Sequence, residues 1–274
     1  MNPRNFLKQT VFLPLGRALG YPEIQHASPL INGGNFLYYW LYAYNQEGRG
    51  IQTRVQERER ILVWFEQFPW LKKYSVRPKL PHRLLSAWNG TSPDILGRDF
   101  TAEQLQNFCR ELLESSPAFM AKVEGYRALL GEKTCLINIR RGDYYQHQHL
   151  IDQYGLDNEK YVVAALGLLP ESYTRFCLVS DDIGWCQEHI TPLIPGEVFY
   201  NHNRQDMFDD LALLTAAPAL VLANSTFSFW GGHLGDTLNP QRLVLAPPYH
   251  FKNPDGSYNR ERFDRSWAVV EISE

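Results

Sequence analysis

The stretch Leu136-Ile137-Asn138-Ile139-Arg140-Arg141-Gly142-Asp143-Tyr144 decides the fold of this chain. An apolar run stops at two adjacent arginines, a glycine and an aspartate, which is typical of a buried strand that delivers charged side chains to the edge of a sheet. A guanidinium group matches phosphate oxygens two at a time, and a glycine lets the chain turn sharply beside a ligand. A first hypothesis is a phosphate-bearing donor held at this strand end. The alternative is a solvated turn in which Asp143 pairs with an arginine for structural reasons.

Apolar runs alternate with helical segments throughout the chain after Gly131. We expect strands at 134–139, 175–180, 198–200, 219–223, 243–246 and 267–272, and helices at 158–169, 183–190, 207–217 and 227–234. Continuous apolar strands separated by helices are typical of a parallel sheet covered on both faces. Residues 131–274 are therefore expected to form a Rossmann-like parallel sheet domain, whose ligands would bind at the carboxyl ends of the strands.

Residues 1–130 favour a largely helical N-terminal domain. The first thirty residues read as irregular because they contain Pro14, Pro22 and Pro29. A short apolar start at 30–32, the glycine pair Gly33-Gly34 with Asn35, and an aromatic segment over 36–44 predict a strand, a loop and a helix whose N-terminus could face an anion or a sugar. A plain turn at the glycine pair is the alternative. Further helices are expected at 52–68, 101–113 and 116–130.

Composition narrows the class of protein. The chain has 274 residues, of which 44% are hydrophobic and 21% charged, so it is globular. Its formal net charge of -3 gives no global basic field, and we expect no nucleic-acid partner. The 4 cysteines form no CxxC pair, which argues against a zinc site and favours reduced thiols in a cytoplasmic protein. No apolar stretch reaches the roughly 18 residues of a membrane span.

Polar side chains follow three of the expected strands. They stand in the blocks Arg140-Arg141-Gly142-Asp143, Ser180-Asp181-Asp182 and Asn224-Ser225-Thr226-Phe227-Ser228. Together they suit a nucleotide: hydroxyls and backbone N–H groups at a helix start hold a diphosphate, an arginine neutralises it, and a carboxylate accepts hydrogen bonds from guanine. The alternative is that one aspartate, and Asn224 or Ser225, only cap the helices that follow.

These blocks resemble the α-1,2-fucosyltransferase family (glycosyltransferase family 11), bacterial type, which moves fucose from GDP-fucose to galactose. The resemblance rests on 139–144, on Ser-Asp-Asp-Ile-Gly-Trp-Cys at 180–186, on Asp-Leu-Ala-Leu at 210–213 and on Ala-Asn-Ser-Thr-Phe-Ser-Phe-Trp-Gly at 223–231. It implies a GT-B-like α/β protein, with residues 1–130 on the acceptor side and residues 131–274 binding GDP-fucose.

The chain departs from the family pattern at three places. Asn138 stands where the family has histidine, and Phe229 stands for the first tryptophan of the third block. The glycine-rich block near the start is reduced to residues 33–36 and is preceded by about thirty extra residues. These departures concern the acceptor side most.

The resemblance also implies roles for single residues. Arg140 would contact the GDP diphosphate, and Arg141 and Asp143 would brace the loop or line the site. Asn138 would stand at the guanine or fucose, and Asp181 or Asp182 would bind guanine. The β-phosphate would be cradled by Asn224, Ser225, Thr226 and Phe227, and fucose or phosphate would be faced by Gly33, Gly34 and Asn35.

The implied reaction is inverting, metal-independent transfer of L-fucose to the 2-OH of a terminal β-galactoside on an oligosaccharide acceptor, with no cofactor besides the donor. Arg140 would replace a divalent metal by stabilising the charge that develops on GDP. Asp143, His147 and His149 are open candidates for a general base. Two alternatives remain: a GDP-fucose-dependent enzyme with another acceptor, and a non-catalytic nucleotide-sugar-binding protein.

Overall fold

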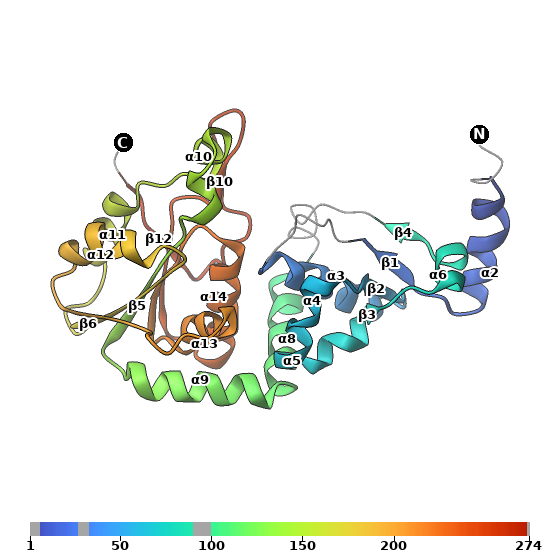
Figure 1. Ribbon diagram of the computed structural model, residues 1–274, viewed down its shortest axis with the longest axis horizontal. Helices are drawn as coiled ribbons and strands as arrows, with labels where there is room; N and C mark the ends of the chain where they lie inside the picture. Colours follow the sequence, from blue (N-terminus) through green and yellow to red (C-terminus); the bar gives the residue numbers. More distant parts are fainter. Residues whose placement is uncertain (1–5, 27–32, 90–99, 273–274) are drawn as a thin grey trace. The chain divides into compact units, whose positions relative to one another are not determined.

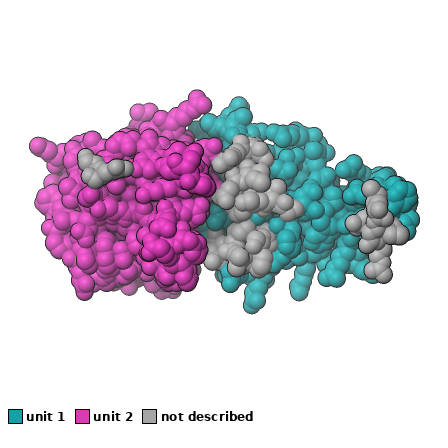
Figure 2. Space-filling view, turned by 90° about the horizontal axis from the view of Figure 1, so that it is seen from above, with its two compact units in different colours: residues 1–117 teal, residues 118–274 magenta. Residues whose placement is uncertain are grey.

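The computed structural model describes residues 6–26, 33–89 and 100–272 and divides the chain into two compact units, residues 1–117 and 118–274 (Figures 1 and 2). Each unit contains a parallel sheet with helices, so the chain has the α/β, GT-B-like class expected from its sequence. The division falls at the start of α9 (Pro117–Leu130), whereas the sequence analysis placed the boundary at the end of this helix.

The second unit is built on a parallel sheet of six strands. Their order across the sheet is β12 (Ala268–Val269), β9 (Leu243–Ala246), β8 (Ala219–Val221), β5 (Thr134–Ile139), β6 (Arg175–Ser180) and β7 (Glu197–Tyr200). From β5 the chain adds strands outward on one side, and from β8 it adds them outward on the other. The neighbouring strands β5 and β8 therefore form the switch point of a doubly wound sheet, beside which ligands of such sheets bind.

Every residue of β5 is buried, which explains its continuous apolar run. On one face Cys135, Ile137 and Ile139 pack in a core that includes Tyr161 of α11 (Asn158–Leu166). The register places Ile139 opposite Ser180 of β6. The two strands therefore end side by side, and the residues that follow them meet at the same edge of the sheet.

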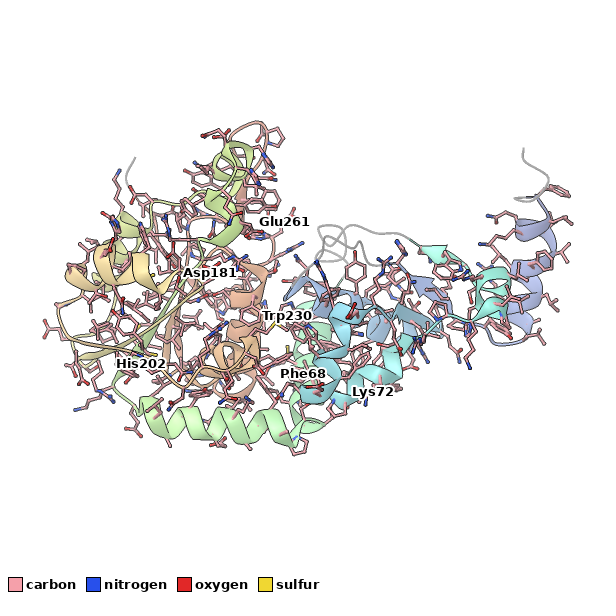
Figure 3. The ribbon with its side chains drawn as sticks, in the orientation of Figure 1. Phe68, Lys72, Asp181, His202, Trp230 and Glu261 are labelled. Atoms are coloured by element: carbon pink, nitrogen blue, oxygen red, sulfur yellow. The ribbon has the colours of Figure 1, made fainter. Side chains whose placement is uncertain are left out.

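Three helices follow the strands at this edge: α12 (Ile183–His189), α13 (Met207–Ala216) and α14 (Thr226–Leu238). α13 packs against α14, which carries the fully buried Trp230 (Figure 3). The buried Arg242 joins the two helices: it pairs with Asp236 at 2.7 Å and donates hydrogen bonds to the carbonyl oxygens of Leu214, Thr215, Ala217, Gly231 and Gly232.

The remaining elements of the second unit are short. They are η3 (Gly142–Tyr145), α10 (Gln148–Tyr154), η4 (Thr191–Leu193) and the antiparallel pair β10 (Phe251–Lys252) and β11 (Tyr258–Asn259). All four cysteines are buried free thiols, as expected from their apolar surroundings.

The first unit also contains a parallel sheet, which the sequence analysis did not predict. Its order is β3 (Ser75–Val76), β2 (Thr53–Gln56), β1 (Glu23–Gln25) and β4 (Trp88–Asn89). These strands are only two to four residues long, so they show no period that distinguishes them from loops. The single helix expected at 52–68 is wrong: this region holds β2, α4 (Glu59–Leu62) and α5 (Trp64–Gln67), followed by η2 (Pro69–Tyr74).

The predicted helices of the first unit are otherwise present. α3 (Asn35–Gly48) buries most of its aromatic side chains, and α8 (Ala102–Glu114) begins after Thr101, whose hydroxyl accepts a hydrogen bond from the N–H of Gln104 at 3.2 Å. The strand expected at 30–32 lies outside the described residues.

The expected irregular N-terminal region is wrong where the structure describes it. Residues 8–18 form a short π-helix, η1 (Lys8–Phe12), that continues into α2 (Leu13–Ala18). Pro14 stands in the first turn of α2, a position that tolerates proline. α2 packs on α6 (Leu80–Leu85) at Gly16, where a Cβ would overlap the carbonyl group of Leu85.

Candidate functional site

Arg140 is the first residue after β5, and its guanidinium group bridges two carboxylates. Nη1 lies 2.8 Å from Oδ2 of Asp181, and Nη2 donates a hydrogen bond to Oδ1 of Asp143 at 2.7 Å. Burial alone would lower the pKa of Arg140, but attraction to the carboxylates of Asp181 and Asp143 outweighs it, so the pKa is raised. The two contacts use two of the five N–H donors of the group, which leaves capacity to bind an anion at the strand end.

The turn after Arg140 is built around Asp181, the first residue after β6 (Figure 3). Its Oδ1 accepts a hydrogen bond from the backbone N–H of Arg141 at 2.9 Å, while Oδ2 pairs with Arg140. Gly142 follows with a φ of +26°, and a Cβ there would overlap Oδ2 of Asp181. Glycine is required at this position both by the backbone angle and by the approach of the carboxylate.

Arg141 lies between two aromatic rings. Its guanidinium carbon is 3.8 Å from the ring centroid of Trp185 and 4.4 Å from that of Tyr145, and Nε donates to Oδ2 of Asp182 at 3.2 Å. Asp182 also caps α12, because its Oδ1 accepts a hydrogen bond from the N–H of Trp185 at 3.3 Å. One of the two aspartates was expected to cap this helix, and it is Asp182. Arg141 and Asp182 thus hold together the loops that follow β5 and β6.

α14 begins after the end of β8, the strand beside β5. Ser225 occupies the N-cap position, but its side chain forms no capping hydrogen bond with the described residues. The turn is held instead by Ser228, whose hydroxyl accepts from the N–H of Ala223 at 3.0 Å, and by Asn224, whose amide donates to the carbonyl of Tyr154 at 2.6 Å. The first N–H groups of a helix have no partner inside the helix, and such helix N-termini are common anion-binding sites in proteins.

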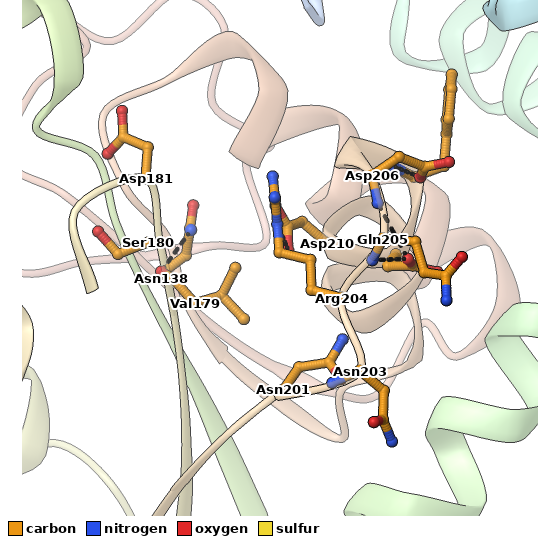
Figure 4. Close-up of polar contacts among 12 residues, drawn as sticks. Asn138, Val179, Ser180, Asp181, Asn201, Asn203, Arg204, Gln205, Asp206 and Asp210 are labelled. Carbon is orange, nitrogen blue, oxygen red and sulfur yellow. Dashed lines mark hydrogen bonds and ion pairs between the residues drawn. The ribbon is translucent and has the colours of Figure 1, made fainter. Parts of the chain in front are cut away.

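A cavity of about 200 Å³ opens at the ends of β6 and β7. Figure 4 shows Arg204 and Asp210, two of the residues that line it. Its apolar lining includes Val179, Ile183 and Tyr200. Its polar lining includes Asp210 of α13 and Arg204, whose Nε lies 2.9 and 2.8 Å from the two carboxylate oxygens of Asp210.

Asp210 is largely buried, and its side chain is 13% exposed. Burial raises the pKa of Asp210 to about 6, although the neighbouring Arg204 acts in the opposite direction. No role was expected for Asp210 from the sequence. The signal that could have found it is the Asp-Leu-Ala-Leu motif, in which a carboxylate stands at the start of an otherwise apolar helix segment.

Asn138 lies in β5, two residues before Arg140, and is 8% exposed. Its side-chain amide donates a hydrogen bond to the carbonyl of Val179 at 3.0 Å, next to the cavity (Figure 4). Of the three candidates for a general base, Asp143 contacts Arg140, whereas His147 and His149 are exposed and stack on each other with 5.7 Å between ring centroids.

The structure brings most of the predicted site residues to one edge of the second sheet. Asn138, Arg140, Arg141, Asp143, Asp181 and Asp182 follow or end β5 and β6, and Asn224, Ser225, Thr226 and Phe227 follow β8. The other three residues belong to the first unit. There Gly33 has a φ of +52°, Gly34 is the buried N-cap residue of α3, and Asn35 begins that helix.

Among the residues that the structure describes, no group of three or more histidine, cysteine, aspartate or glutamate side chains is placed to hold a metal ion. No helix in the same residues combines the length and the apolar character needed to cross a bilayer.

Comparison with solved structures gives distant similarities. A crystal structure of POFUT1 in complex with GDP-fucose aligns with a TM-score of 0.42 and 12% identity, over 98% of this chain and 79% of that chain. The glycosyl transferase family 9 protein from Veillonella parvula aligns with a TM-score of 0.47 and 11% identity, over 93% of this chain and 88% of that chain.

Sequence comparisons are more specific. An alpha-1,2-colitosyltransferase of Escherichia coli is 32% identical over 103 residues, which are 36% of this chain and 35% of that protein. The O-antigen biosynthesis glycosyltransferase WbnK of Escherichia coli is 24% identical over 149 residues, 53% of this chain and 45% of that protein. The matched regions therefore span less than half of each relative. Residues 96–258, more than half of the chain, match the family described as glycosyl transferase family 11. The chain belongs to glycosyltransferase family 11.

Proposed function

We propose that this protein transfers L-fucose from GDP-fucose to the 2-OH of a terminal β-galactoside, with inversion and without a divalent metal. The observation that carries the proposal is the position of Arg140 at the switch point of the sheet, held by Asp181 and Asp143 and adjacent in the sheet to the strand that leads into α14. An arginine and a helix N-terminus at the ends of neighbouring strands form a site for a diphosphate.

Arg140 would act mainly in the transition state. Cleavage of the bond between fucose and phosphate builds negative charge on GDP and positive charge on the sugar. A fixed guanidinium group stabilises the developing negative charge more than it stabilises the bound donor, and this difference lowers the barrier. The carboxylates of Asp181 and Asp143 keep the group in place before the donor binds. The Ser225 hydroxyl and the first turn of α14 would hold the β-phosphate.

We place guanine in the cavity beside these residues, with Asp210 as its partner. Both oxygens of Asp181 already contact residues 140 and 141, and Asp182 caps α12. The carboxylate of Asp210 lines an open cavity with apolar walls that suit a flat base, and its partner Arg204 has a side chain that is 46% exposed and free to turn outward. It would accept hydrogen bonds from the ring N–H and the amino group of guanine, and Arg204 would move aside.

A second candidate donor is a colitose nucleotide, because one relative is a colitosyltransferase. Colitose is fucose without its 3-hydroxyl group, so both sugars fit the same leaving-group chemistry. They differ by one hydrogen-bonding group, which a site built to bind that hydroxyl distinguishes strongly.

The test is release of GDP from GDP-fucose and from GDP-colitose, with and without lactose, in the presence of EDTA. We expect lactose-dependent release from GDP-fucose that survives EDTA and is lost in Arg140→Ala. The exposed Arg265 gives a matched control, and Arg265→Ala should retain full activity. Faster release from GDP-colitose would favour the second donor, and release that lactose does not change would call for another acceptor. Binding of GDP without any release would favour the non-catalytic alternative.

A further inference from the structure

The N-terminal part of the first unit exposes an unusual number of large apolar side chains. Of the fourteen large hydrophobic residues that are exposed among the described residues, seven lie on the segment 6–19 and on α6. They are Phe6, Leu7, Val11, Leu15 and Leu19 on the first segment and Leu80 and Leu84 on α6. We call these seven residues the apolar face.

The spacing of four of these residues places them on one side of the first segment. Leu7, Val11, Leu15 and Leu19 recur every four residues along η1 and α2, so they lie on one side of the helical segment. Gly16 lies on another side, where α2 meets α6. Packing within the unit therefore uses one side of the segment and leaves a second apolar side exposed. Clustered exposure of this kind marks an interaction surface.

The charges around the face identify the partner. Residues 6–22 and 77–86 contain the five basic residues Lys8, Arg17, Arg77, Lys79 and Arg83 and no aspartate or glutamate, in a chain whose net charge is -3. Of these five residues, Arg17 forms an ion pair with Glu23, the residue directly after the range 6–22, and this pair is loose at 3.7 Å. An apolar face with a basic border is the pattern of helices that lie in the surface of an anionic bilayer.

A second copy of the chain fits less well. A symmetric dimer places the same surface of both subunits in contact, so the basic border of one subunit would face that of the other. We propose that η1, α2 and α6 dock the protein on the surface of an anionic lipid membrane. The apolar side chains enter the headgroup region, and the basic side chains contact lipid phosphates.

The experiment is co-sedimentation of the full chain with phosphatidylcholine vesicles that contain or lack phosphatidylglycerol. We expect binding that needs the anionic lipid and weakens as salt is added. Leu15→Ser combined with Leu19→Ser should lower the partition coefficient into anionic vesicles by about tenfold or more, because two leucine side chains that would enter the membrane interface are removed. Lys79→Glu combined with Arg83→Glu should abolish the preference for anionic lipid.

Matched variants separate docking from unfolding. Leu168→Ser replaces a leucine of the second unit that is 53% exposed, and Arg265→Glu reverses an exposed charge; both should bind vesicles as the wild type does. All variants should keep the wild-type melting temperature and GDP affinity. The proposal is overturned if the wild type ignores anionic vesicles, or if the α2 variants bind them equally well. It is also overturned if sedimentation velocity shows a dimer that the α2 substitutions dissociate while vesicle binding is absent.

Discussion

Replacing Asp210 by asparagine is expected to stabilise the ligand-free protein at neutral pH. Burial raises the pKa of Asp210 from 3.8 to about 6 in the folded state. Between about pH 4 and pH 6 the folded state therefore binds more protons than the unfolded state, and stability falls as the pH rises through this window. About two pKa units correspond to about 3 kcal/mol of unfolding free energy at pH 7. The asparagine variant carries no ionisable carboxyl group and avoids this loss.

The assay is urea unfolding of the wild type and the variant across the range from acid to mildly alkaline pH. The two free energies should coincide near pH 4 and separate to about 3 kcal/mol at pH 7, with the variant more stable. GDP affinity should fall in the same variant by about tenfold to a hundredfold, because hydrogen bonds to a charged acceptor are lost. The exposed carboxylate of Asp152 gives the control, and Asp152→Asn should change neither quantity.

Two results would refute this reasoning. A stability difference that does not vary with pH would show that Asp210 ionises in the folded protein at no cost, so that burial does not govern it. A variant that is stabilised as expected but binds GDP with wild-type affinity would leave the electrostatic argument intact and remove the guanine from this cavity.

Three further changes test the loop after β5. Arg140→Ala should lower kcat by about 10²–10³-fold in single-turnover kinetics while GDP affinity changes by less than about tenfold, and equal losses in both would contradict a transition-state role. Gly142→Ala should lower the unfolding free energy by about 1–3 kcal/mol and reduce transfer, whereas Gly125→Ala, where a Cβ meets nothing within 4 Å, should be stabilising in the same thermal melts. Arg141→Lys should cost about 1–2 kcal/mol in thermal denaturation through the loss of two ring contacts, and an unchanged melting temperature would argue against them.

The second unit could be predicted closely because its strands are long apolar runs bounded by polar blocks. β5, β6 and β9 have the bounds expected from the sequence, because burial on both faces leaves short apolar runs, and the polar blocks and helical segments around these runs favour strands of a parallel sheet. The convergence of the arginine, aspartate and serine blocks followed from the parallel order alone, because carboxyl ends of parallel strands share one edge.

Other features could not be predicted because they depend on contacts between distant segments. The strands of the first unit are too short to show an alternating hydrophobic pattern. They are recognised only through their pairing with a neighbouring strand, as β2 pairs with β3. The different roles of Asp181 and Asp182 depend on which carboxylate meets Arg140, and neighbouring positions in sequence do not show this. The cavity at Asp210 forms only when α13 meets the loop after β7.

The packing around Arg242 affects how the two ends of a bound donor would be positioned. Its guanidinium group fixes the end of α13 to the middle of α14, and a Cβ at Gly231 would overlap the side chain of Leu214, so the two helices approach closely. In the proposed assignment Asp210 on α13 holds the base, and Ser225 at the start of α14 holds the phosphates. Rigid helix packing, rather than loop conformation, then sets the spacing between the two ends of the nucleotide. The packing of the two helices would then fix where the phosphates lie before the sugar makes any contact.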